Sequence, residues 1–290
     1  MILLLILIVV PFGVALQTYA FFWYETASSA HRQYLEELSN GKLGRLLFKG
    51  ILSSFFSVLL TLLLYPTGLW RRLWQPCIDP DCPRPPVVLI HGLYHNVSAW
   101  TLFRRRLHAA GFANLYFLGY SSWNQTFPAL VMRLEQLLAE VRERFPNHPP
   151  ILIGHSLGGL LGRACAQSLE GPARLAGVIT LGTPHKGSKL AALGLGKLAK
   201  SLIYRGPLIN RLHDGKRKAA IPCVALYSPI DNMVLPNQAL QTTEAGWVHQ
   251  ETAPISHVAM LYHRQTAQLV LEYLKSMSND EDGGRMTEDG

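Results

Sequence analysis

The stretch from residue 151 to residue 164 reads ILIGHSLGGLLGRA and constrains the fold more than any other part of the chain. It begins as an apolar strand, ends in helix-forming residues, and places Gly154 and Gly158 two positions on either side of Ser156. A serine alone could simply cap the helix. Two flanking glycines are needed only where the backbone turns so tightly that side chains would collide. The pattern therefore predicts a sharp strand-to-helix turn that presents the serine hydroxyl above the end of a sheet, as a candidate nucleophile.

Strand and helix patterns alternate from Pro86 onward, which is typical of a parallel sheet covered by helices. Apolar runs predict strands at residues 87–91, 115–120, 151–154, 175–183 and 220–228. Besides the helix after Ser156, helical patterns are expected at residues 98–110, 128–145 and 261–277. Residues 185–218 are too long for an ordinary connection, so they form either a crossover helix or a lid or acyl-binding segment. The predicted fold class is α/β, a mostly parallel sheet with helices on both faces.

A serine hydroxyl is a poor nucleophile at neutral pH, so it needs a histidine base and a carboxylate that orients the base. In α/β folds that present a nucleophilic serine on such a turn, the order along the chain is nucleophile, acid and then histidine. Asp231 directly follows an apolar strand, at the sheet edge where sites of α/β proteins collect, so it is the predicted acid. Its rivals are Asp214, which lies in a turn among charged residues, Glu170, Glu244 and Glu251.

His257 is the predicted base, because it lies in a loop just before the last predicted helix. The other histidines after the serine are His249, its nearest rival, His185, His213 and His263. Attack on a carbonyl group also creates an oxyanion, which needs hydrogen-bond donors. The predicted donors are the backbone N–H groups of Leu157, directly after the serine, and of Leu93, in the loop after the first strand. No cofactor or metal is expected, since no cluster of metal-ligating residues stands out in the sequence.

Two long segments of the chain carry no charged side chain: the first 24 residues and residues 50–70, the latter followed by Arg71 and Arg72. Each is long enough to cross the hydrocarbon core of a bilayer. A cleaved signal peptide fits the first less well, because no Lys or Arg precedes Arg32. The two segments predict a transmembrane helical hairpin, and the alternative for the second is a helix packed on the rest of the protein. Basic residues near the segments are almost balanced, with a slight lean toward a catalytic domain outside the cytoplasm, in the periplasm of a bacterium.

The expected organisation is a membrane anchor at residues 1–74, a linker at 75–85, an α/β domain at 86–277 and a disordered acidic tail at 278–290. Cys77 and Cys82 are close enough in the chain to form a disulfide, but the spacing alone does not decide whether they do. Cys165 and Cys223 lie in apolar patterns typical of core residues. The net charge of +8 comes with no nucleic-acid motif, so no nucleic-acid partner is expected. Basic residues beside a membrane anchor favour contact with anionic lipid headgroups. The oligomeric state stays open.

Five motifs together resemble a known family. They are His91-Gly92-Leu93 after the first strand, GHSLGG at residues 154–159, LGTPHKGS at 181–188, D-x-x-V-x-P at 231–236, and the late His257. Over residues 86–276 the chain resembles the bacterial lipase and esterase branch of the α/β-hydrolases, including triacylglycerol lipases. The LGTPHKGS motif is also similar to segments of inositol deacylases of lipid anchors. One departure is Ser256, where the family more often has glycine.

The resemblance implies hydrolysis of carboxylic esters through an acyl-enzyme, with Ser156, Asp231 and His257 as the catalytic residues. Because an anchored enzyme meets the acyl chains of a bilayer at high local concentration, the expected partners are the membrane and a lipid or other acyl ester. The expected activity is that of a membrane-bound lipase, esterase or phospholipase A. The alternatives are an acyltransferase or thioesterase with the same three residues, and a non-catalytic membrane protein that keeps the fold.

Overall fold

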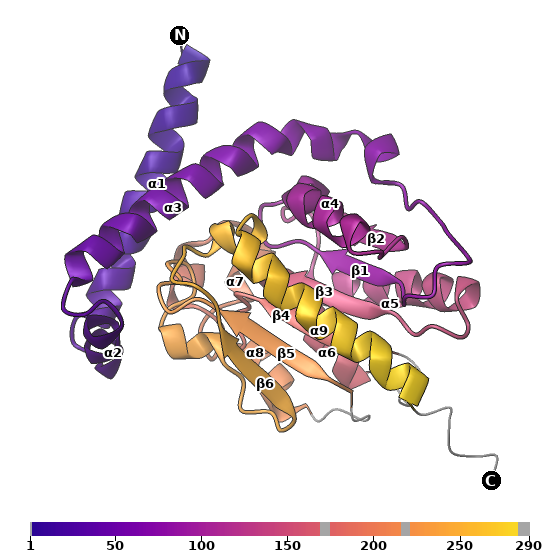
Figure 1. Cartoon of the computed structure of the whole chain (residues 1–290). Helices are drawn as coiled ribbons and strands as arrows, with labels where there is room; N and C mark the ends of the chain where they lie inside the picture. Colours follow the sequence, from indigo (N-terminus) through magenta and orange to yellow (C-terminus); the bar gives the residue numbers. More distant parts are fainter. Residues whose placement is uncertain (1, 169–174, 216–220, 284–290) are drawn as a thin grey trace.

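A six-stranded, fully parallel sheet forms the centre of the molecule in the computed structural model, which describes residues 2–168, 175–215 and 221–283 (Figure 1). The strands lie in the order β2-β1-β3-β4-β5-β6, with bounds β1 Val87–Ile90, β2 Leu115–Leu118, β3 Ile151–His155, β4 Gly177–Leu181, β5 Cys223–Tyr227 and β6 Trp247–Glu251. The first five confirm the predicted strands. The sequence analysis missed β6 because its sequence, WVHQE, is mostly polar, as suits an edge strand on which Val248 is half exposed.

Helices cover both faces of the sheet, as the sequence predicts (Figure 1). Successive strand residues point to opposite faces, so Val87 and Leu89 pack into one core while Val88 and Ile90 pack into the other. The helices concerned are α4 Thr101–Ala109 and α9 Arg264–Gly283 on the first face, and α5 Phe127–Arg144 and α6 Leu157–Ser168 on the second. Strands buried on both faces explain the continuous apolar runs of the sequence.

The structure differs from the expectation in two places, the segment 185–218 and the end of the last helix. Residues 185–218 do not form one crossover helix. They contain a 3-10 turn, η5 (Lys189–Leu193), and the short helices α7 (Gly196–Lys200) and α8 (Pro207–Asp214), and residues 216–220 lie outside the described part. Helix α9 runs on to Gly283, past residue 278 where the tail was expected to begin, because residues 278–282 are polar but include no glycine or proline to stop the helix. Residues 284–290 lie outside the described residues.

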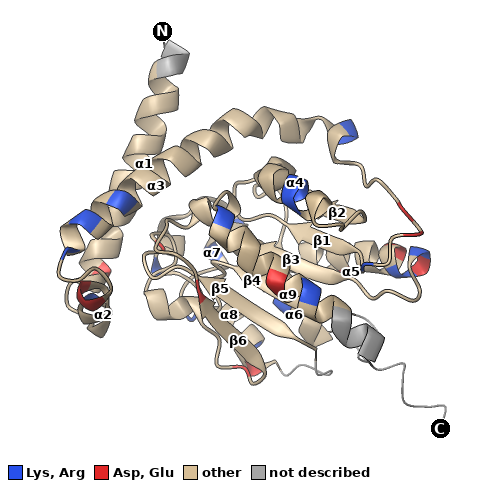
Figure 2. Ribbon diagram, viewed as in Figure 1, with Lys and Arg blue, Asp and Glu red and all other residues tan. Residues whose placement is uncertain are grey.

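Three helices precede the sheet: α1 Ile2–Thr26, α2 Ala30–Leu38 and α3 Leu43–Leu64, followed by the 3-10 turns η1 Tyr65–Leu69 and η2 Arg71–Trp74. Two segments are long and apolar enough to cross a membrane, Leu5–Thr26 and Leu43–Leu69, and only 22% and 28% of their most apolar windows are buried. The second begins earlier than residue 50, because Arg45 and Lys49 are exposed on the helix without interrupting it. Long uncharged stretches of α1 and α3 are visible in Figure 2.

Helices α1 and α3 pack on each other, and α3 arches over the α/β domain (Figure 1). Gly50 permits the close contact between them, because a Cβ atom there would lie 2.5 Å from the hydroxyl of Tyr19. Along its length α3 contacts the 3-10 turns η3 (Val97–Trp100) and η7 (Val258–Leu261) of the α/β domain. The two apolar helices and the domain therefore share a packed interface.

The four cysteines, all within the described residues, form no disulfide. Cys77 is exposed, and Cys82 is buried with its Sγ 3.5 Å from the carbonyl oxygen of Gly111, so the disulfide that the spacing allows is not formed. Cys165 and Cys223 are buried in the core, as predicted.

Candidate active site

Ser156 stands on the sharp turn between β3 and α6 that the sequence predicts. Its backbone has φ +54°, a left-handed conformation that is unusual for a residue with a side chain. Its N–H donates to the carbonyl of Leu181 on the neighbouring strand, at 2.8 Å. Neither glycine leaves room for a side chain. A Cβ at Gly154 would lie 2.4 Å from backbone atoms of residues 158 and 159, and a Cβ at Gly158 would lie 2.1 Å from the carbonyl oxygen of Ile90. Because the clashing atoms belong to the backbone, they cannot shift without disrupting the strand and the helix, so the turn needs glycine at both positions.

Asp231 and His257 meet beside this turn. The His257 Nδ1–H donates to Asp231 Oδ2 at 2.6 Å, and both side chains are buried. The other carboxylate oxygen accepts the backbone N–H groups of Met233 and Val234, each at 2.9 Å. A carboxylate held by three hydrogen bonds fixes the histidine tautomer and leaves Nε2 as the free ring nitrogen.

The structure separates the rival acids and bases from this pair. Asp214 is exposed at the end of α8, Glu244 forms an ion pair with the buried Arg163, and Glu251 accepts a hydrogen bond from the Tyr34 hydroxyl. Glu170 lies outside the described residues. The remaining histidines have other contacts: His249 accepts the N–H of Thr242, and rings of His185, His213 and His263 lie by Thr180, Thr243 and Thr266.

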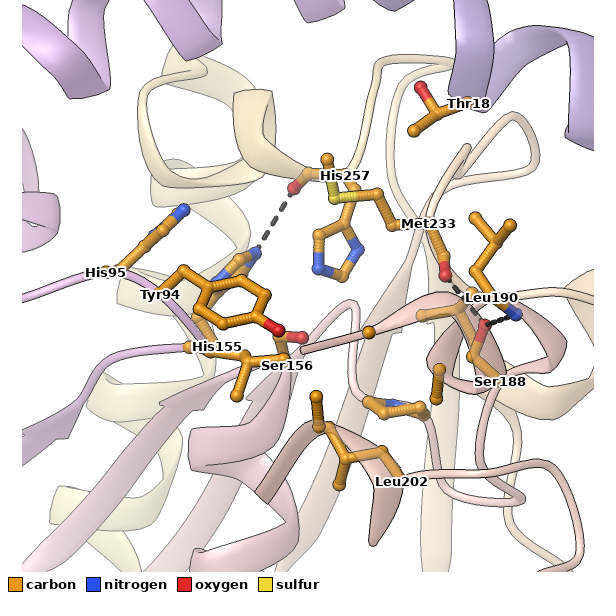
Figure 3. Close-up of a pocket in the computed structure, with 17 residues that line it drawn as sticks. Thr18, Tyr94, His95, His155, Ser156, Ser188, Leu190, Leu202, Met233 and His257 are labelled. Atoms are coloured by element: carbon orange, nitrogen blue, oxygen red, sulfur yellow. Dashed lines mark hydrogen bonds between the residues drawn. The ribbon is translucent and has the colours of Figure 1, made fainter. Parts of the chain in front are cut away.

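Ser156 and His257 line one apolar cavity with a volume of about 260 Å³. Figure 3 shows the His257 ring beside Met233 and above Ser156. In the described part of the chain no hydrogen bond joins the serine hydroxyl to the histidine, and such bonds are often loose before substrate binds. The cavity wall includes Leu190 and Ala191 of η5 and Ala199 of α7, so the segment after β4 contributes part of its apolar lining.

The two predicted oxyanion donors flank the serine. Leu157 is the first residue of α6, so its N–H has no acceptor within the helix. Leu93 lines the same cavity in the loop that leaves β1, followed by Tyr94 with φ +61°. The Tyr94 N–H donates to Ser122 Oγ at 2.8 Å, which fixes the path of this loop next to the serine.

Two buried histidines next to the site stay neutral. Burial lowers the pKa of His91 to about 4, and burial together with the nearby His257 ring lowers the pKa of His155 well below its usual value. His155 Nε2–H donates to the carbonyl of His257 at 3.2 Å, so His155 supports the loop that bears the base. His91 donates from Nδ1 to the carbonyl of Gly92 at 2.9 Å.

Three contributors were not found by sequence analysis. Asn232 accepts the backbone N–H of His257 on Oδ1 at 3.1 Å, and Thr18 of helix α1 lines the cavity. Gly182 has φ +55°, and a Cβ there would lie 3.1 Å from His257 Nδ1 and 3.2 Å from Asp231 Oδ2. Its place in the LGTPHKGS motif was a signal for Gly182, whereas Thr18 and Asn232 depend on contacts between distant parts of the chain.

A parallel sheet with a serine on a strained turn after a central strand, and an aspartate and a histidine on later loops, defines a protein of the α/β-hydrolase class. Residues 87–274 match the model of the alpha/beta hydrolase family, and the chain belongs to that family. Among curated proteins it is 38% identical over 117 residues to triacylglycerol lipases of Pseudarthrobacter phenanthrenivorans and Burkholderia plantarii. The matches cover 37% of this chain and 35% and 32% of those lipases, so the chain spans about a third of their length.

Solved structures share the fold at low identity. The mature lipase BlEst2 of Bacillus licheniformis has a TM-score of 0.58 at 20% identity, over 69% of this chain and 96% of that one. A monoacylglycerol lipase of Paleococcus ferrophilus has a TM-score of 0.53 at 18% identity, over 67% and 96%. Phospholipase PlaB of Legionella pneumophila has a TM-score of 0.53 at 16% identity, over 69% and 61%.

Proposed function

We propose that this protein is a membrane-anchored serine hydrolase that cleaves carboxylic ester bonds of lipids, as a lipase, esterase or phospholipase A. The observation that carries the proposal is the buried Asp231–His257 pair, 2.6 Å from Oδ2 to Nδ1, on the same apolar cavity as Ser156. An apolar cavity suits an acyl chain, and the family and the lipase relatives favour ester substrates.

In the proposed reaction Ser156 Oγ attacks the ester carbonyl carbon while His257 Nε2 takes the hydroxyl proton. Asp231 holds the ring and stabilises its charged form. The N–H groups of Leu93 and Leu157 donate to the oxyanion, and one such donor is worth about 3 kcal/mol in the barrier. The intermediate then breaks its bond to the alcohol oxygen, and that alcohol leaves with the proton from His257.

An ester of Ser156 with the acyl group remains. A water molecule gives a proton to His257 and attacks this ester, and collapse of the second intermediate returns the proton to Ser156 and releases the carboxylic acid. Transfer to an alcohol or release from a thioester would use the same residues, but the relatives and solved structures named above are lipases and a phospholipase.

The membrane part of the proposal is supported by the exposed apolar side chains of the two candidate spans. Outward residues of α1 and α3 include Val9, Phe12, Leu52, Phe56 and Leu63. Large apolar side chains exposed along two long helices are shielded from water when a lipid bilayer surrounds them.

The test is a substrate panel with the full chain purified in detergent: p-nitrophenyl butyrate, a long-chain triglyceride, and phospholipid in mixed micelles, with released acids measured by mass. Ser156→Ala should remove nearly all release while the folded protein remains. Addition of an alcohol acceptor separates hydrolysis from transfer, because an acyltransferase would make new ester in place of free acid. Activity of Ser156→Ala within tenfold of the parent would reject this serine as the nucleophile.

A further inference from the structure

Helices α1 and α3 make buried polar contacts with the two loops that carry the acid and the base. The Tyr19 hydroxyl of α1 donates to the carbonyl of Ile230, the residue before Asp231, at 3.0 Å. In α3, Ser53 Oγ accepts the N–H of Ser256, the residue before His257, at 3.1 Å. A helix pair that served only to hold the enzyme at a membrane would need no hydrogen bonds to these particular loops.

Asn232 joins the two helices to the base. Its side chain is fully buried, and its Oδ1 accepts the backbone N–H of His257 at 3.1 Å. Its Nδ2 donates to Thr18 Oγ1 of α1 at 2.6 Å and lies 3.3 Å from Ser54 Oγ of α3. Because Oδ1 must face the N–H group, the amide group has one orientation, and both of its donors are directed at the helices.

Ser256 repeats the arrangement one residue before the base. Its hydroxyl oxygen lies 3.2 Å from Ser53 Oγ and 3.4 Å from Ser57 Oγ. Further along α3, Thr61 Oγ1 lies 2.9 Å from the Tyr262 hydroxyl. The departure from the family's usual glycine at position 256 thus coincides with a contact to α3.

The two faces of α3 carry different kinds of side chain. The inward face is a stripe of small residues, Gly50, Ser54, Ser57 and Thr61, all buried. The outward face carries large apolar side chains, Leu52, Phe56 and Leu63, at 40%, 61% and 55% exposure. Small residues let a helix backbone approach closely, and their hydroxyl groups hydrogen-bond across the contact.

We propose that the α1–α3 pair is part of the catalytic unit, with Asn232 as a positioning residue through which Thr18 and Ser54 hold the backbone of His257, and with Ser53 holding Ser256. The inference rests on the proposed function for the identity of the reaction. Misplacement of a base by about 1 Å can lower turnover about 10²-fold, so loss of these bonds should reduce kcat even on a substrate that needs no membrane.

The test compares inward and outward changes on one helix. Ser53→Ala/Ser54→Ala and Asn232→Ala are measured against Leu52→Ala/Phe56→Ala, all as full-length protein in the same detergent with water-soluble p-nitrophenyl butyrate. The inward variants should lower kcat, about 10²-fold for Asn232→Ala and about tenfold for the double serine variant, with KM within twofold. Ser53→Thr should recover most of the turnover that Ser53→Ala loses, because it restores the hydroxyl. The outward variant should keep the parent kcat.

A second readout separates this inference from the proposed function. The rate at which a fluorophosphonate labels Ser156 depends on the base but not on the natural substrate, so it should fall in parallel with kcat. If the parent cleaves no ester of the panel, the proposed function fails, and the labelling rates still test positioning. Inward variants with kcat and labelling rates within twofold of the parent would overturn the inference. Equal losses in the inward and outward variants would overturn it too. Because Asn232→Ala can impair folding, the inference is judged on the serine variants whose melting temperature equals that of the parent.

Discussion

At the scale of single residues, the proposed reaction depends on the environment of one carboxylate. Asp231 is buried and accepts three hydrogen bonds, two from backbone N–H groups and one from His257. Asp214 is exposed on α8. The same residue type is thus a fixed acceptor in one place and a solvated charge in the other.

Asp231→Asn should therefore lower kcat for p-nitrophenyl butyrate by about 10⁴-fold, because a neutral amide can favour the wrong histidine tautomer and cannot stabilise the charged ring. The matched change Asp214→Asn should stay within twofold. The measurement is steady-state hydrolysis by both variants at equal folded concentration. The reverse ranking would assign the acid to Asp214.

Stability should fall on mild acidification, because His91 and His155 are buried with pKa values lowered by that burial. Below pH 6.5 the unfolded chain binds protons at these histidines while the folded protein does not, so unfolding becomes more favourable as pH falls. Each contributes about 1 kcal/mol per pH unit until its folded pKa is reached.

Melting temperatures between pH 7.5 and 5.5 measure this effect. His91→Gln should flatten the pH dependence, whatever it does to stability at pH 7.5, and His213→Gln, at an exposed position, should leave it unchanged. A parent melting temperature that is constant over this range would contradict the prediction.

At the scale of secondary-structure elements, the contact between α1 and α3 depends on one glycine. A side chain at Gly50 would meet the ring and hydroxyl of Tyr19, and that hydroxyl donates to Ile230 beside the acid. Gly44 lies on the same helix, and a Cβ there would meet nothing within 4 Å.

Gly50→Leu should separate the helices, lower the melting temperature and reduce kcat, whereas Gly44→Leu should preserve both, since leucine has the higher helix propensity. Thermal unfolding in detergent and p-nitrophenyl butyrate hydrolysis check the pair. Similar behaviour of the two variants would show that the contact at Gly50 contributes little.

The strands and the turn also show which parts of the structure can be predicted from the sequence. Strands β1 to β5 were predictable because strands buried on both faces have continuous apolar sequences. The turn at Ser156 was predictable because the glycines on either side of it are required by its geometry. Edge strand β6 was missed because half-exposed residues carry no such pattern. Asn232 and Thr18 were missed for another reason: their role is a contact across 214 residues of chain, and neither residue type is distinctive by itself.

At the scale of the whole molecule, the membrane anchor and the side of the membrane that the α/β domain faces both stay predictions, the second with a slight lean to the outside. The chain supplies a probe for it: Cys77 is exposed, and Cys82, Cys165 and Cys223 are buried.

In intact spheroplasts a membrane-impermeant maleimide should therefore label the parent protein at Cys77, and Cys77→Ser should remove the signal. Protection of the parent before lysis, followed by labelling after lysis, would place the catalytic domain in the cytoplasm.

The contacts of Asn232 also set an order of events during synthesis. Thr18 and Ser54 precede Asn232 by 214 and 178 residues, so both helices leave the ribosome long before the loops that they hold. Contacts across such separations form late in folding. A nascent chain therefore carries its two apolar helices and Ser156 before the loop of His257 is held in position. On the proposed function, ester hydrolysis can begin only after that loop has been translated and has packed on α3.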